Sequence, residues 1–274
     1  MKAGRQQVVM PEVVQWFVSA FTTYGEFCLR RKFHSVRVAR EGMAMDIGKR
    51  PVVFYVNHAS WWDPLVCLSL AGQFFPGRKS YAPIDPQMFE RYAFFRYLGF
   101  FPAGAGSPAA ALRFVERCKL ILHDGDRALW ITPQGGFRDV RERPVAFMKG
   151  LGAVAAAGVP AVFVPLAIEY VFWSESKPEV LVSFGDAVDG GAGVEGTVRS
   201  DPAAWTEEFE GRMSRTQDRL AELVCRRDPD DWEVLLAGAR GTHAPYDLWR
   251  WLRARLRGER YVRDHQETVK TPES

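Results

Sequence analysis

The sequence of 274 residues has only four cysteines, and none of them forms a C-x-x-C pair. This spacing gives no sign of a disulfide framework or a zinc site, and it favours a reducing compartment. No run of about 20 apolar residues occurs, so no transmembrane helix is predicted. The histidines outside residue 58 show no ligand spacing, so no metal ion is expected. A G-x-S-x-G turn is also missing, which argues against hydrolases that carry their nucleophile there.

The sequence also has no large excess of positive or negative residues. The net charge is only +3, which does not argue for a nucleic-acid partner. Locally, residues 30–50 hold seven basic groups against two acidic ones, and residues 250–263 hold six arginines against one glutamate. Two such patches fit an anionic membrane surface or acidic ligands, although either patch alone is explained as well by a solvated face.

The remaining composition is that of a globular protein, with 47% hydrophobic and 25% charged residues. Aromatic residues reach 13%, which is high and indicates a lipid site or a membrane face beyond the needs of a core. The length allows one large domain or two small ones.

Residues 12–29 are predicted to form an amphipathic helix with a wide apolar face. Arg30-Arg31-Lys32 follows directly, as in helices that lie in a membrane interface. A helix packed on the protein's own core explains the pattern equally well. We divide the chain into a membrane-interface helical segment (1–33), an α/β domain (34–226) and a helical basic tail (227–274), in which residues 247–258 are again amphipathic. The expected location is peripheral, on the cytoplasmic face of a membrane.

The α/β domain alternates apolar strands with helices, which predicts a mostly parallel sheet flanked by helices. Strands are expected at 34–39, 51–57, 79–84, 127–132, 160–168 and 179–184. Helices are expected at 64–71, 86–98, 107–123, 148–157 and 203–226.

The most informative stretch is Asn57-His58-x4-Asp63, which follows the buried strand at 51–57. Ligands of open α/β sheets bind at the carboxyl ends of the strands. A tight loop can bring the Asp63 carboxylate to one imidazole nitrogen of His58, which leaves the other nitrogen able to take a proton. This pair is predicted to be a general base with its orienting carboxylate, and Asn57 is expected to shape the turn and contact substrate.

Two further segments follow predicted strands. In Pro133-Gln134-Gly135-Gly136-Phe137-Arg138 the glycines allow close backbone approach to a ligand, and Arg138 can bind a phosphate or carboxylate. Arg141, Arg143 and Lys149 add cations nearby. The second segment, Val164-Pro165-Leu166-Ala167-Ile168, is a strand with an internal proline, which indicates an edge strand or a wall of the site.

These segments together resemble the glycerophospholipid acyltransferase family, which includes the 1-acylglycerol-3-phosphate acyltransferases. Asn57-His58-x4-Asp63 is similar to its N-H-x4-D block. Residues 133–138 resemble P-E-G-T-R, and Phe147-Met148-Lys149-Gly150 follows as F-K-x-G does. Residues 164–168 resemble V-P-V-A-I.

The resemblance implies transfer of an acyl group from acyl-coenzyme A or acyl carrier protein to a hydroxyl of a lysophospholipid or of another lipid or hydrophobic alcohol, without an acyl-enzyme and without a cofactor. It assigns catalysis to His58 and Asp63, and substrate binding to Asn57, Gln134, Gly135, Gly136, Arg138 and Lys149. Two departures stand out. Gln134 replaces the usual glutamate, and residues 100–105 lack the arginine of the F-I-D-R block, for which Arg113 is a candidate substitute. The missing arginine favours a less anionic acceptor, such as a glycolipid or another hydrophobic alcohol.

Two other functions stay open on the sequence. One is a non-catalytic module that binds lipid or acyl carrier protein, which the two departures favour. The other is a thioesterase in which His58 activates water.

Overall fold

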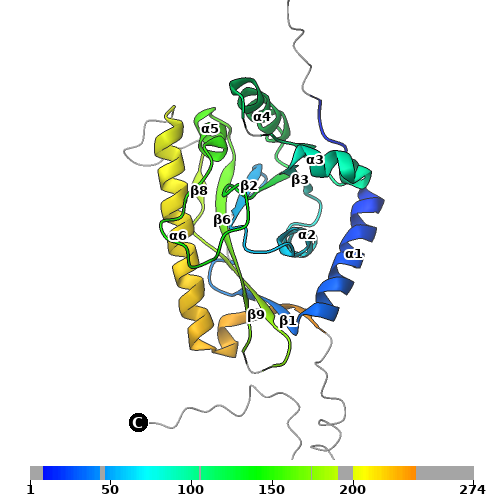
Figure 1. Ribbon diagram of the computed structural model, residues 1–274, viewed down its shortest axis with the longest axis vertical. Helices are drawn as coiled ribbons and strands as arrows, with labels where there is room; N and C mark the ends of the chain where they lie inside the picture. The colour runs from blue at the N-terminus through cyan, green and yellow to red at the C-terminus, as the bar shows by residue number, and fades with distance from the viewer. Residues whose placement is uncertain (1–8, 44–46, 105, 174, 191–199, 239–274) are drawn as a thin grey trace, which may run out of the picture.

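The structure is a computed structural model that describes residues 9–43, 47–104, 106–173, 175–190 and 200–238 (Figure 1). Its helices are α1 (Gln15–Lys32), α2 (Asp63–Phe74), α3 (Pro86–Arg91), α4 (Pro108–Ile121), α5 (Gly150–Ala156) and α6 (Pro202–Arg226), with 3-10 helices η1 (Ala93–Tyr97) and η2 (Pro229–Asp231). Its strands are β1 (Ser35–Ala39), β2 (Val52–Val56), β3 (Lys79–Ile84), β4 (Phe100–Pro102), β5 (Arg127–Ile131), β6 (Val162–Val171), β7 (Glu179–Phe184), β8 (Val188–Asp189) and β9 (Trp232–Ala237).

All strands belong to one mixed sheet with the order β4-β3-β5-β2-β6-β7-β1-β9, and β8 also pairs with β6. The pairs β3–β4, β3–β5, β2–β5, β2–β6 and β1–β7 are parallel, whereas β6–β7, β6–β8 and β1–β9 are antiparallel. The predicted α/β fold with a mostly parallel sheet is therefore confirmed.

Helices cover both faces of the sheet, and this explains the continuous apolar strands. In β2, Val52, Phe54 and Val56 join the core under α1 and α2, while Val53 and Tyr55 join the core under α4, α5 and α6. Figure 1 shows α1 and α2 on one side of the strands and α5 and α6 on the other. Complete burial of each such side chain contributes about 1.5–3 kcal/mol, so β2 is a firm base for the loop that follows it.

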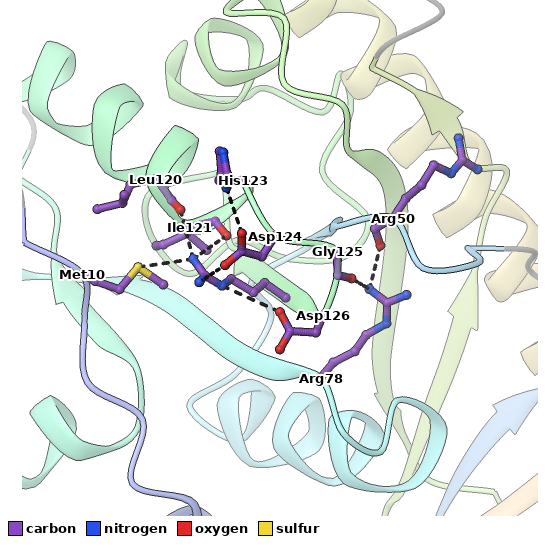
Figure 2. Close-up of polar contacts among 10 residues, drawn as sticks. Met10, Arg50, Arg78, Leu120, Ile121, His123, Asp124, Gly125 and Asp126 are labelled. Carbon is purple, nitrogen blue, oxygen red and sulfur yellow. Dashed lines mark hydrogen bonds and ion pairs between the residues drawn. The ribbon is translucent and has the colours of Figure 1, made fainter.

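The amino ends of the strands are closed by a network of arginines and backbone carbonyls (Figure 2). The Arg78 guanidinium, directly before β3, donates to the carbonyls of Gly48, Arg50 and Gly125. Arg127, at the start of β5, pairs with Asp124 and donates to the Leu120 carbonyl. These two guanidinium groups therefore stabilise the fold at the amino ends of the strands. A ligand site is expected at the opposite, carboxyl ends.

Helix α1 packs on the protein's own core along one face. Phe21 contacts Phe94 with ring centroids 5.5 Å apart, and a Cβ on the buried Gly25 would lie 3.2 Å from Leu65 of α2. The opposite side of α1 leaves Trp16, Tyr24 and Phe27 between 60% and 73% exposed. Among the described helices none is long and apolar enough to cross a membrane.

Three short strands were not predicted, and one of them changes the expected tail. Within 227–274, which was expected to be helical, Trp232–Ala237 forms β9 against β1, with Trp232 and Leu236 buried. β4 and β8 have three and two residues, too few for a recognisable pattern. The amphipathic segment 247–258 lies outside the described residues.

The proline in β6 does not mark an edge, because β6 lies between β2 and β7. The Pro165 carbonyl accepts a hydrogen bond from the Gly185 N–H, at the point where the partner of β6 changes from β7 to β8. Since the nitrogen and the carbonyl of one residue point to the same side of a strand, the missing N–H of Pro165 falls in this interruption of the ladder.

Candidate active site

His58 and Asp63 meet at the carboxyl end of β2. The loop 57–62 leaves β2, and Asp63 begins α2. The imidazole Nδ1 of His58 lies 2.8 Å from Oδ2 of Asp63. The His58 side chain is 19% exposed and the Asp63 side chain 1%, so the carboxylate is buried beneath a ring that solvent and a substrate can reach. With the proton on Nδ1, the Nε2 atom is free to accept another one.

The Asp63 carboxylate is fixed by more than the imidazole. Its Oδ2 also accepts a hydrogen bond from the Ser60 backbone N–H at 3.0 Å. Its Oδ1 accepts one from the Tyr170 hydroxyl at 2.6 Å. Burial and the neighbouring Asp63 charge raise the pKa of Tyr170 far above its ordinary value, so this phenol stays a neutral donor. A carboxylate held in this way keeps one orientation of the ring.

Asn57 fastens the end of β2 to β6. Its side-chain Nδ2 donates to the Ile168 carbonyl at 3.0 Å, and its Oδ1 accepts from the Ile168 N–H at 2.7 Å. The residue is only 1% exposed. Of the two roles predicted for Asn57, the geometry supports the shaping of the turn. Because both amide atoms are used and buried, contact with a substrate is not supported.

The second predicted segment reaches His58 through hydrogen bonds. The Gln134 side-chain Oε1 accepts from the His58 backbone N–H at 2.7 Å, and the Arg138 backbone N–H donates to the His58 carbonyl at 2.8 Å. Gly135 has a φ of +70°, a conformation that glycine adopts without strain. Gln134 therefore positions the histidine loop instead of offering its carbonyl to a ligand.

One aromatic ring packs against the imidazole, and other apolar side chains of the neighbouring loops are exposed. The Phe137 ring lies 4.4 Å from the His58 ring, centroid to centroid, and is 59% exposed. Trp61, in the loop between His58 and Asp63, is 67% exposed. Met148 is 47% exposed, and its backbone N–H donates to the Pro133 carbonyl. The segments next to His58 therefore expose apolar side chains to solvent.

The cations expected near this edge are mostly paired with carboxylates. Arg141 contacts Asp139 at 2.7 Å, Arg143 pairs with Asp218, and Arg138 lies 3.7 Å from Glu142. Lys149 is exposed at the start of α5, next to the Met148–Pro133 hydrogen bond. This pairing weakens the predicted role of these arginines as an anion-binding cluster.

A comparison with protein families matches residues 30–169, just over half of the chain, to the Acyltransferase domain. The chain belongs to the glycerophospholipid acyltransferase family. The resemblance seen in the sequence is thus confirmed, and the enzyme class implies an acyl donor and an acceptor. The comparison with curated proteins finds no match.

The matched region contains His58, Asp63, Gln134 and all of the acyltransferase segments quoted above. The family arginine that residues 100–105 lack has no evident substitute, because Arg113 is exposed on α4 and no described contact links it to the His58 loop. In the part of the chain that the structure describes, no group of three or more His, Cys, Asp or Glu residues could hold a metal ion.

The sequence did not predict the contacts that two residues make at this site. Tyr170 follows Asp63 by 107 positions and belongs to β6, so only the strand order brings its hydroxyl to the carboxylate. Phe137 was quoted within its segment, but its position over the imidazole depends on the turn at Gly135. Because Asp63 and Tyr170 are 107 positions apart along the chain, motif spacing could not predict their contact.

Proposed function

We propose that this protein is a peripheral membrane O-acyltransferase in which His58 is the general base. Nε2 of His58 removes the proton of an acceptor hydroxyl, whose oxygen attacks the carbonyl carbon of an acyl thioester. The tetrahedral intermediate collapses with cleavage of the C–S bond, and the imidazolium returns its proton to the leaving thiolate. No acyl-enzyme forms. The observation that supports this function is the Nδ1–Asp63 hydrogen bond beneath a partly exposed ring.

Asp63 stabilises the imidazolium that forms during the reaction. Its other hydrogen bonds, from Ser60 and Tyr170, hold it in place without neutralising it. This division of roles is typical of histidine bases, and such a base contributes about 10²–10⁴ in rate.

The glutamine at position 134 does not indicate an inactive enzyme. The His58 N–H needs only an acceptor, and the amide oxygen of Gln134 supplies one at 2.7 Å. The departure from the family glutamate therefore leaves the histidine loop intact. This favours catalysis over the non-catalytic module.

The first test compares two histidine–aspartate pairs of the same chain. His58→Ala should lower transfer of labelled acyl groups from acyl-coenzyme A to a total lipid extract by about 10²–10⁴. His123, whose Nδ1 also lies 2.8 Å from a carboxylate, is 82% exposed in the loop before β5 and supplies the control. His123→Ala should keep wild-type transfer. Unchanged transfer by His58→Ala would refute the general-base role, and fatty acid release without acceptor would favour a thioesterase.

Peripheral membrane attachment is proposed from the outer face of α1. Trp16, Tyr24 and Phe27 expose 73%, 60% and 61% of their surface, although α1 has an apolar face already packed on the core. Arg31 and Lys32 follow in the last turn and are exposed. Exposed aromatics beside terminal cations fit an anionic bilayer interface.

The second test measures cosedimentation with vesicles of phosphatidylcholine and phosphatidylglycerol. The double variant Trp16→Ser/Phe27→Ser should bind about tenfold more weakly, because it removes apolar area that would enter the bilayer. Val234→Ser, at a residue of β9 that is 49% exposed, is the control and should bind like wild type. Equal binding of the α1 variant and wild type would disprove attachment through this face.

A further inference from the structure

A cavity of about 270 Å³ lies between the loop after Arg138, strand β6 and helix α6. It is lined by Val140, Arg141 and Arg143 from the loop, by Ile168 and Glu169 from β6, and by Gln217 and Asp218 among others from α6. Its volume is close to the lower end of small-molecule sites.

This cavity adjoins the histidine loop. Ile168 on its wall exchanges both backbone hydrogen bonds with the Asn57 side chain, one residue before His58. Val140 is two residues past Arg138, whose N–H donates to the His58 carbonyl. A molecule in the cavity therefore lies against residues that anchor the His58 loop.

Gln217 supplies an unused hydrogen-bond acceptor. The residue is 5% exposed, and its Oε1 has no hydrogen-bond partner within the described ranges of the chain. A buried amide oxygen without a donor is unfavourable, so a ligand hydroxyl that draws the Gln217 side chain toward the cavity and donates to its Oε1 gains affinity. Glu169 adds a second acceptor on the opposite wall.

The charges around the cavity select against ions. Arg141 and Arg143 are paired with Asp139 and Asp218, so they offer little net positive charge to a phosphate. A phosphate would also face Glu169, whose carboxyl has its pKa raised by burial. An ammonium group would have to compete with Arg141, whose guanidinium already interacts with the Glu169 carboxylate. Neutral hydroxyl groups can donate to Gln217 and Glu169 without either penalty.

We propose that this cavity binds the polyhydroxylated headgroup, a sugar or another polyol, of a neutral lipid acceptor. The proposal rests on the acyltransferase function above and names its substrate class. It agrees with the paired arginines of the second segment and with the absence of a family arginine at residues 100–105.

The test uses probes that share one dodecyl chain: dodecyl β-D-glucopyranoside, dodecyl phosphate and dodecyltrimethylammonium. Their binding to the full chain is measured by equilibrium dialysis below the micelle concentration. We expect the glucoside to bind about tenfold more tightly than either ion, and Gln217→Leu to lower its affinity about tenfold while the ions bind as before. Glu222→Leu, on the exposed side of α6, is the matched control and should change none of the three affinities.

A second variant covers the case in which Gln217→Leu does not fold. Glu169→Leu, at a partly exposed position, should also weaken glucoside binding, and saturation-transfer NMR of the wild-type complex should show the sugar protons in contact with the protein. Equal binding of the three probes, or glucoside binding unaffected by both variants, would overturn the proposal.

The same samples separate this proposal from the proposed function. In acyl transfer from acyl-coenzyme A to the glucoside, Gln217→Leu should raise KM and leave kcat near the wild-type value. Selective binding of the glucoside without transfer to any alcohol would refute the acyltransferase mechanism and keep the cavity assignment. Transfer without headgroup preference would refute the cavity assignment alone.

Discussion

The Asp63 side chain has 1% of its surface exposed, and its Oδ2 contacts only the imidazole and the loop that holds the imidazole among the hydrogen bonds described above. Its Oδ1 accepts from the Tyr170 hydroxyl, which comes from the neighbouring strand β6. A buried carboxylate that lacked this donor would lose part of its compensation for desolvation. The His58–Asp63 pair is therefore completed by a residue of the central strand β6.

Substitutions of Gln134 test whether the His58 backbone N–H needs a hydrogen-bond acceptor. Gln134→Glu keeps an oxygen for the His58 N–H, so acyl transfer should stay within about threefold of wild type. Gln134→Leu has a similar size but no acceptor, and leaving the N–H unpaired costs about 1–3 kcal/mol. Transfer and the midpoint of urea unfolding should both fall. Equal activity of the two variants would show that the hydrogen bond is unimportant.

At the scale of elements, the segment between β5 and α5 contains two adjacent glycines, Gly135 and Gly136, and its turn depends on only one of them. Gly135 has a φ of +70°, and an added Cβ would lie 2.3 Å from the Met148 sulfur. Gly136 has no positive φ, and an added Cβ would meet nothing within 4 Å. The two adjacent glycines look equivalent in the sequence, but only Gly135 is constrained by a positive φ and by a neighbouring side chain.

Alanine substitutions should reveal this difference. Gly135→Ala is expected to lower the free energy of unfolding by about 1–3 kcal/mol, because of backbone strain and displacement of Met148. Gly136→Ala should change it by less than about 0.5 kcal/mol. Urea denaturation measures both, and adding Met148→Ala to Gly135→Ala should restore only the steric part. A similar loss in the two single variants would contradict the assignment of strain to Gly135.

At the scale of the whole molecule, burial of phenols couples stability to alkaline pH. Burial raises the pKa of Tyr55, which is 0% exposed in β2, and that of Tyr170. The unfolded chain loses these protons near about pH 10, whereas the folded chain retains them. Above that pH the unfolded state binds fewer protons than the native state, so stability falls as pH rises.

Tyr55→Phe should make this fall shallower. Each such phenol contributes a slope of about 1.4 kcal/mol per pH unit above pH 10, and the variant removes one of them. Denaturant unfolding at several values from about pH 9 to 11 measures the slope. Phe209→Leu, whose ring lies 5.0 Å from that of Tyr55, carries no titrating group and should lower stability by a constant amount. A wild-type slope in Tyr55→Phe would disprove the contribution of this phenol.

The sequence by itself determined where the central strands and helices lie along the chain, and it predicted the contact between His58 and Asp63. Continuous apolar runs predicted a sheet covered on both faces, and the short spacing of His58 and Asp63 allowed one loop to join them. Both signals are local, because they depend on periodicity or on a loop of a few residues.

Only the tertiary structure decided the contacts between distant segments. The Tyr170–Asp63 bond and the Asn57 clamp on Ile168 join residues that are 107 and 111 positions apart. The cavity beside Gln217 likewise joins separate elements, β6, α6 and the loop after Arg138. β9 is another such case: a helix was expected in this part of the tail, but the segment forms a strand that pairs with the distant β1. Strand order and register bring such residues together, and a single sequence carries no direct record of either, since each depends on how the whole sheet buries its two faces.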